Sequence, residues 1–375
     1  MPEIAVDASK FAGMSEEQAR TFPRRTVVGE QLTDAQTAAM PKMISTDAHV
    51  MEPEELWTDL PKRLQDVLPR VPFRNSPPGA TDPHLRLRDQ DTDGVAAEIL
   101  FPNYGMALFG IDDLETQQES FKLYNDWVHN FCQADNKRLY AAPLVSVYDI
   151  KAGIKEMQRG HLNGLKGAMI WQVPDPNLPF TSEHYEPLWA ACAEAKEPVI
   201  CHILTGHSYV KTGQKKGIQG LKDATNTKTN DSANTLFDFI FSGAFDRHPD
   251  LKLLLAESEI GWLPFLLQQW DYYFERFRKT YDLAITRKPS EIFEEHVYGT
   301  FLEDYVGTRF FPWWGEKNCM WSNDYPHPNS TWPNSRDVIR RDLGHLPEAI
   351  RAKVIRETVA RLYNLPKILP LAGLG

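Results

Sequence analysis

The stretch ISTDAHV at residues 44–50 decides how the whole chain is interpreted. It is short, its apolar residues lie on both parities, and it ends in Asp47 and His49, which a strand places on the same face. Seven later stretches are similarly short and apolar: residues 95–101 (VAAEILF), 141–147 (AAPLVSV), 165–171 (LKGAMIW), 198–204 (PVICHIL), 251–258 (LKLLLAES), 296–301 (HVYGTF) and 318–324 (NCMWSND). Strands without polar and apolar alternation are typical of a parallel sheet that is covered on both faces.

Longer amphipathic stretches separate these strands and predict helices. Residues 115–136, for example, carry Phe121, Tyr124, Val128 and Phe131 at helical spacing. The other predicted helices are residues 149–159, 182–195, 234–247, 262–281 and 346–363. Eight strands alternating with helices predict an α/β fold, a single (β/α)8 TIM barrel, and a doubly wound open sheet is the alternative.

Three long insertions interrupt the alternation, at residues 53–88, 206–231 and 310–315. Loops that follow strands lie at the catalytic end of a barrel, and loops this long are usually functional. Residues 1–42 are polar and weakly periodic, which predicts an N-terminal extension. Residues 43–375 are then expected to form one barrel domain.

The composition excludes several classes of partner. The 375 residues carry 51 acidic and 41 basic side chains, a formal net charge of -10, so neither nucleic acid nor an anionic membrane is expected as a partner. No apolar run approaches the roughly 20 residues of a membrane span. The four cysteines are far apart, which argues against a disulfide framework. No signal-peptide core is visible, so a cytoplasmic location and a small-molecule substrate are expected.

Candidate metal ligands lie at the ends of three predicted strands. Asp47 and His49 end the first strand, His202 interrupts the apolar fifth, and Asp324 ends the eighth. Strand ends converge at one mouth of a barrel, where carboxylates and imidazoles make a divalent-metal site. Each residue alone has a simpler explanation, because a lone buried His is often a hydrogen-bonded core residue and a lone Asp is often a turn residue. Their convergence favours the metal site.

At this point the sequence resembles a known family. Residues 44–365 are similar to the amidohydrolase superfamily, in its branch related to aminocarboxymuconate-semialdehyde decarboxylase. The motifs that carry the resemblance are DAHVMEP at 47–53, LRDQDTDG at 87–94, FPN at 101–103, SNDYPHP at 322–328, STWP at 330–333 and ARLY at 360–363. The resemblance implies a metal-dependent barrel enzyme, with His49, His202 and Asp324 as ligands and Asp47 as the first ligand of the strand-one pair. Family members are commonly dimers, so a homodimer is expected.

One position departs from the decarboxylases of this branch, which usually place a catalytic His at the end of the sixth strand. This chain has Glu257 there. A carboxylate cannot supply an imidazolium proton, but it can act as a base or bind a metal. The alternative is that Glu257 merely caps the helix that follows.

Other residues near predicted strand ends are candidates for catalysis or substrate binding. His327 follows Asp324 by three residues and is expected to be an acid or base, or to support a ligand. Glu52 is expected either to start a helix or to bond to a ligand, without binding the metal itself. The substrate-binding candidates are Phe101, Asn103, Tyr104, His207, Trp313 and Trp332. Local packing is the alternative for the aromatic residues, and His207 is also placed to approach a second metal.

The predicted donor set of two imidazoles and two or three carboxylates suits a divalent cation, with Zn expected first and Mn or Fe as alternatives. With Asp324 as base, such a centre supports hydrolysis. With a carboxylated substrate on the metal, it supports decarboxylation instead. If Glu257 helps to bind a second iron, the alternative is a nonheme diiron monooxygenase that acts on an acyl substrate. A non-catalytic binding barrel is the remaining possibility.

Overall fold

The computed structural model describes residues 32–69, 76–207 and 217–366. Eight strands form its centre: β1 (Met43–Val50), β2 (Val95–Pro102), β3 (Leu139–Ala141), β4 (Ala168–Ile170), β5 (Val199–His202), β6 (Leu253–Ala256), β7 (Val297–Phe301) and β8 (Cys319–Trp321). They pair in parallel, in the orders β1-β2-β3 and β4-β5-β6-β7-β8. All eight predicted strands are present, although β3 lies earlier than residues 141–147.

Backbone contacts close the two remaining seams of the sheet. Between β3 and β4, the Val145 N–H donates to the Met169 carbonyl at 2.9 Å. Between β8 and β1, the Asp324 N–H donates to the Asp47 carbonyl at 3.0 Å. The strands therefore form a closed barrel rather than an open sheet, which confirms the predicted fold.

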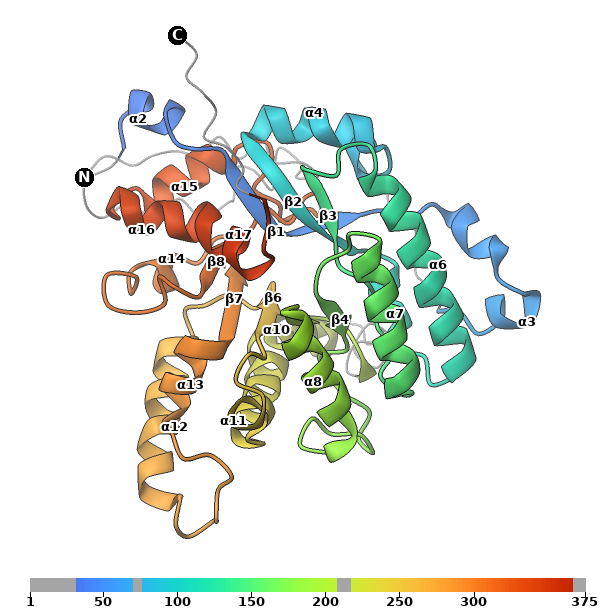
Figure 1. The fold of residues 1–375 in the computed structure, drawn as a ribbon. Helices are drawn as coiled ribbons and strands as arrows, with labels where there is room; N and C mark the ends of the chain where they lie inside the picture. Colours follow the sequence, from blue (N-terminus) through green and yellow to red (C-terminus); the bar gives the residue numbers. More distant parts are fainter. Residues whose placement is uncertain (1–31, 70–75, 208–216, 367–375) are drawn as a thin grey trace.

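Helices surround the barrel (Figure 1). Those of at least eight residues are α4 (Pro83–Asp93), α6 (Leu114–Cys132), α7 (Ile150–Leu162), α8 (Glu186–Ala195), α10 (Gly217–Phe241), α12 (Leu263–Phe277), α13 (Pro289–His296) and α15 (Ser335–Leu343). Shorter ones are α2 (Asp34–Ala38), η2 (Glu54–Asp59), α3 (Lys62–Gln65), η3 (Pro78–Ala80), α5 (Gly105–Leu108), η4 (Glu183–Tyr185), α11 (Ala244–Arg247), α14 (Tyr305–Thr308), α16 (Glu348–Ala352), η5 (Lys353–Glu357) and α17 (Thr358–Leu362). None of the described helices is long and apolar enough to cross a membrane.

Two of the predicted insertions contain helix, which corrects their reading as loops. The insertion at 53–88 includes the start of α4, whose N-cap Asp82 accepts from the backbone N–H groups of His84 and Leu85. The polar insertion at 206–231 includes more than half of α10, which begins at Gly217. Polar residues there lack the apolar spacing that reveals a helix in a sequence.

Only the end of the predicted N-terminal extension lies within the described residues. There α2 is held to the barrel domain by Arg336, whose guanidinium donates to the carbonyls of Thr37 and Met40, both at 3.1 Å. The division between residues 1–42 and 43–375 stays a prediction.

Every residue of β1 is buried, including the polar ones. This strand therefore brings Asp47 and His49 into the interior, where a charged group is costly unless it is paired or binds a metal. The barrel thus positions the candidate site at the ends of its strands.

Candidate metal centre

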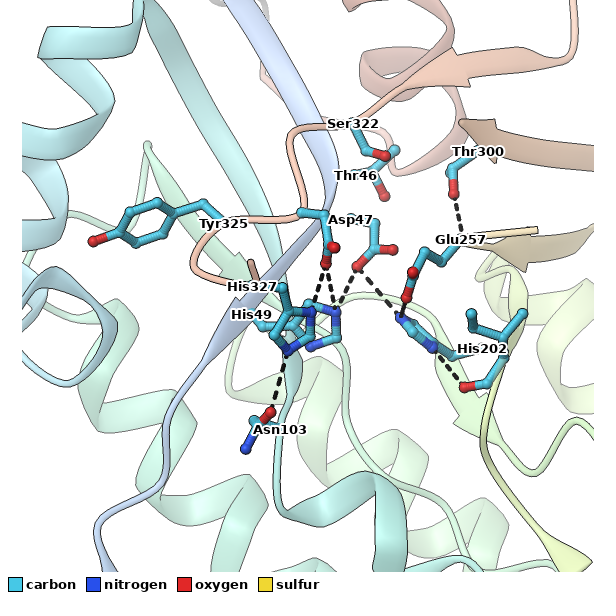
Figure 2. Close-up of polar contacts among 12 residues, drawn as sticks. Thr46, Asp47, His49, Asn103, His202, Glu257, Thr300, Ser322, Tyr325 and His327 are labelled. Atoms are coloured by element: carbon cyan, nitrogen blue, oxygen red, sulfur yellow. Dashed lines mark hydrogen bonds and ion pairs between the residues drawn. The ribbon is translucent and has the colours of Figure 1, made fainter. Parts of the chain in front are cut away.

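Four strand ends supply a compact group of buried carboxylates and imidazoles (Figure 2). On β1, Asp47 Oδ1 lies 3.0 Å from His49 Nε2, and His202 Nε2 at the end of β5 lies 3.4 Å from the same oxygen. Asp324 Oδ1, after β8, is 3.4 Å from His49 Nε2. Glu257 Oε2, directly after β6, is 3.9 Å from His202 Nε2. The five predicted ligands are therefore brought together at one point.

Backbone carbonyls fix the orientation of both ligand imidazoles. His49 Nδ1 lies 2.8 Å from the Pro102 carbonyl, and His202 Nδ1 lies 2.8 Å from the Ile203 carbonyl. A carbonyl only accepts, so Nδ1 carries hydrogen in both rings and Nε2 is turned towards the carboxylates. This is the arrangement in which metal-binding histidines are held by their second nitrogen.

The chemistry of these atoms fits a divalent cation. Within the part of the chain that the structure describes, Asp47 Oδ2, Asp324 Oδ2 and His49 Nε2 are buried without a hydrogen-bond partner. Asp47, His49, His202 and Glu257 each offer a donor atom within 4.8 Å of the others. Nitrogen and oxygen donors of this kind suit Zn, Mn or Fe. The cluster is therefore a buried site for a divalent metal.

Electrostatics in the cluster favour an ionised Asp47. Burial alone would raise the pKa of Asp47, but the neighbouring His202 and His49 outweigh it and hold that pKa below its usual range. Burial lowers the pKa of His202, whereas Asp47 and Glu257 raise it more strongly, to about 9. A cation that binds here would therefore displace a proton from an imidazole.

The backbone is strained where two of these carboxylates leave their strands. Glu257 and Asp324 have φ values of 54° and 51°, in the left-handed region that side chains other than glycine rarely adopt. The N–H of Glu257 donates to Thr300 Oγ1 at 2.7 Å, which fixes the turn. Strain of this kind is common where the backbone aims a side chain into a functional site.

The family follows from the sequence over almost the whole barrel. Residues 44–365 match the model of a family described as amidohydrolase. The chain belongs to the amidohydrolase family. The predicted family is thereby confirmed, and with it the prediction of an amidohydrolase-type enzyme.

Several solved structures share this amidohydrolase fold. A 5-carboxyvanillate decarboxylase from Sphingomonas paucimobilis is 22% identical, with a TM-score of 0.71, over 87% of this chain and 99% of that chain. An amidohydrolase from Mycobacterium avium subsp. paratuberculosis is 19% identical, with a TM-score of 0.71, over 86% and 99%. A dihydroxybenzoic acid decarboxylase from Polaromonas, with bound manganese and the inhibitor 2-nitroresorcinol, is 18% identical, with a TM-score of 0.64, over 89% and 100%. A search of curated proteins found no match.

His327 adds a third imidazole at the edge of the amidohydrolase centre. Its Nδ1 lies 2.8 Å from Asp324 Oδ1, its Nε2 lies 3.2 Å from Asn103 Oδ1, and its ring centroid is 4.1 Å from that of His49. Burial lowers the pKa of His327, but the charge and hydrogen bond of Asp324, together with the charges of Glu257 and Asp47, outweigh burial and raise it. The side chain is 17% exposed, so the imidazole can exchange protons with solvent.

Among the predicted substrate-binding residues, Phe101 and Asn103 reach the centre. The Phe101 ring lies 5.4 Å from the His202 ring and 6.2 Å from the His49 ring, so it forms an apolar wall. Tyr104 turns away, because its hydroxyl donates to the Pro69 carbonyl at 2.7 Å.

The structure does not bring the other three substrate-binding candidates into the cluster. His207 belongs to a separate polar group, with its Nε2 3.1 Å from the Tyr148 hydroxyl. Trp332 packs against Tyr325, with ring centroids 5.1 Å apart, and its indole N–H donates to the Asp89 carbonyl. Trp313 is 68% exposed and borders a groove with α13, which ends where β7 begins. Because Trp313 precedes β8, it lies at the end of the barrel opposite Asp324.

Arg86 is a supporting residue that was not predicted. It is fully buried, donates to Glu98 Oε2 at 2.6 Å and to the His49 carbonyl at 2.7 Å, and so holds β1 beside β2. The sequence carried a signal for it, because a lone glutamate within the apolar stretch VAAEILF needs a buried cation.

Proposed function

We propose that this amidohydrolase is a divalent-metal-dependent decarboxylase, a carboxy-lyase that acts on a small, aromatic-sized carboxylate. The observation that carries the proposal is the position of His327, an imidazole held between Asp324 and Asn103 beside the predicted ligands. The decarboxylases among the similar structures support it, as their names give 5-carboxyvanillate and dihydroxybenzoic acid as substrates. The strand-six His that this chain lacks is then replaced in function by His327.

Asp47, His49, His202, Glu257 and Asp324 would hold the cation. When bound, it supplies positive charge that binds a carboxylate and stabilises the electron pair left by carbon dioxide. Manganese in the Polaromonas relative makes Mn the first cation to test, beside Zn and Fe, which suit the same donors.

Two residues near the cation would bind the substrate and supply a proton to it. Phe101 offers an apolar face against which a planar substrate packs. When the bond to carbon dioxide breaks, the electron pair stays on the substrate carbon, and an N–H of the His327 imidazolium supplies the proton that replaces the carboxyl group. Solvent then returns a proton to the partly exposed ring.

The test measures carbon dioxide release by protein loaded with Mn from 2,6-dihydroxybenzoate and from 5-carboxyvanillate. Chelator-treated protein is the control for the metal, and His327→Gln is the control for the proton donor. We expect release to require the metal and to fall by at least about 100-fold in His327→Gln, the scale of a lost acid. Release by His327→Gln at the wild-type rate would refute the role of His327. Hydrolysis of an ester or amide substrate, without release from any carboxylate, would favour the hydrolase.

One observation favours a second candidate, the nonheme diiron monooxygenase. His49 and Glu257 also group with Asp324 and His327, so two overlapping donor groups share these two residues. Three carboxylates and three imidazoles are enough donors for two cations. Two irons per chain, together with turnover of an acyl substrate that needs dioxygen and a reductant, would replace the decarboxylase proposal with this one.

A homodimer, a cytoplasmic location and the domain division at residue 43 remain proposals. Sedimentation of the purified protein tests the first of them.

A further inference from the structure

Glu52 forms a polar contact for which the proposed reaction gives no reason. Its carboxylate is buried just beyond β1 and accepts three backbone N–H groups from the turn that follows β2. Oε2 accepts from Asn103 at 3.1 Å and Tyr104 at 2.9 Å, and Oε1 accepts from Gly105 at 2.8 Å. One side chain therefore binds the whole start of this turn.

The same turn contacts two imidazoles of the centre, those of His49 and His327. The Pro102 carbonyl, at its start, accepts from His49 Nδ1 at 2.8 Å. The Asn103 side chain reaches His327 Nε2 at 3.2 Å (Figure 2). The positions of His49 and His327 therefore depend on where this turn lies.

We propose that Glu52 is a positioning residue that fixes residues 102–105 and, through them, the imidazoles of His49 and His327. The proposal rests on the proposed function for its effect on rate, but its effect on the two rings does not depend on any reaction. Among the residues that the structure describes, the Glu52 carboxylate hydrogen-bonds to this turn and to none of the predicted metal ligands, so it acts through the turn.

The contacts explain why a carboxylate is needed at this position. Three N–H donors converge on the two oxygens, and both oxygens of a carboxylate accept. A glutamine keeps one accepting oxygen and turns an NH2 group towards the backbone N–H groups. At least one hydrogen bond is then lost, because two N–H groups that both donate face each other. The turn is also tight, because a Cβ at Gly105 would lie 2.7 Å from Pro102 Cβ and 3.1 Å from Glu52 Oε1.

A matched control lies at the other end of the barrel. Glu197 is also a buried carboxylate that accepts a backbone N–H, from Gly167, just before β4. Glu197→Gln removes the same kind of contact but leaves the turn after β2 untouched. A general loss of stability would therefore affect both variants alike.

The experiment records imidazole signals by NMR in zinc-loaded protein labelled with 13C-histidine, with His49 and His327 assigned from His49→Asn and His327→Gln. We expect Glu52→Gln to shift both signals, Asn103→Ala to shift only that of His327, and Glu197→Gln to shift neither. In the Mn-loaded enzyme, kcat of Glu52→Gln should fall by about 10- to 100-fold with little change in KM, as expected for the loss of a supporting contact.

Wild-type His49 and His327 signals in folded Glu52→Gln would overturn the proposal. So would equal shifts in Glu52→Gln and Glu197→Gln. If Glu52→Gln does not fold, Asn103→Ala decides, because an unshifted His327 signal in that variant removes the link. A wild-type enzyme that releases no carbon dioxide refutes the proposed function only, since the NMR result still decides the role of Glu52.

Discussion

Asp93 should make the stability of this protein fall as the pH rises towards neutrality. It is the last residue of α4, it is buried, and its Oδ1 and Oδ2 contact the Ser335 N–H and hydroxyl at 2.9 and 2.5 Å. Burial raises the pKa of Asp93 from 3.8 to about 7, although both contacts with Ser335 lower it. The folded protein thus keeps Asp93 protonated over a range of pH in which the unfolded chain has lost the proton.

The direction and the size of this change in stability with pH follow from the linkage between proton binding and folding. A raised folded-state pKa gives stability that is fully present below the unfolded pKa, near 4, and is lost as pH rises through about 7. The whole difference of about three pKa units corresponds to about 4 kcal/mol, of which about 2.6 kcal/mol is lost between pH 5 and pH 8. At about 2.1 cal/mol/K per residue for 375 residues, that loss lowers Tm by about 3 °C.

Asp93→Asn removes the titration and keeps the contacts. The amide oxygen accepts from the Ser335 N–H, and the NH2 group donates to the Ser335 hydroxyl, which can donate in turn to Thr331 Oγ1, 2.7 Å away. Scanning calorimetry of chelator-treated wild type and variant at pH 5, 6, 7 and 8 should show Asp93→Asn gaining about 3 °C relative to wild type over this range.

Asp91, two residues earlier, is the control of opposite sign. Partial burial raises the pKa of Asp91, but its contacts with Arg138 and Lys42 outweigh burial and lower it. Asp91→Asn should therefore lose stability relative to wild type only as the pH rises to about 4, and between pH 5 and 8 its Tm should run parallel to that of wild type. Parallel plots of Tm against pH for Asp93→Asn and wild type would refute the reasoning, because they would mean that Asp93 titrates alike in both states.

Three further predictions concern the centre. His202→Ala should lower metal affinity by at least about 100-fold while far-UV circular dichroism stays unchanged, and His296→Ala, which removes a buried histidine at the end of α13, should keep its metal. Full occupancy in His202→Ala would contradict the ligand set. Glu257→Gln should keep one metal per chain and lose most activity, and elemental analysis would show the loss of a second ion if two bind. Trp313→Ala should leave kcat and KM within about 2-fold of wild type, because surface changes far from a site have small effects, whereas Phe101→Ala should raise KM.

The positions of the candidate ligands on strands were predictable because strand geometry is simple. Period-two alternation put Asp47 and His49 on one face, and a strand buried on both sides gave His202 only the interior to face. Such inferences need no knowledge of the loops. The position of Asp324 was predictable for a related reason, since it closely follows the last strand and all parallel strands end at the same mouth.

The direction in which the Glu257 side chain points was not predictable in the same way. Its direction depends on a φ of 54° and on the hydrogen bond from its N–H to Thr300 on β7, which is 43 residues away in the sequence, and a single sequence reveals neither. Trp313 illustrates the opposite case. A residue shortly before a parallel strand lies at the amino-terminal end of the barrel. The position of Trp313 in the sequence therefore outweighs its aromatic character and argues against substrate binding at the catalytic mouth.

Charge in the centre links the number of cations to the reaction. Asp47, Glu257 and Asp324 together carry three negative charges when ionised, and one divalent cation with a protonated His327 carries three positive charges. With one cation the centre is therefore balanced, and an incoming carboxylate meets no net repulsion. With two divalent cations the same residues leave an excess of positive charge, which an anionic ligand would have to offset. A histidine in place of Glu257 would remove one negative charge, so this glutamate makes the centre less attractive to a carboxylate than a histidine would. The balance of charge in a centre with one cation then depends on the charge of His327. For this reason the contacts that hold the His327 ring matter for the reaction as well as for the fold.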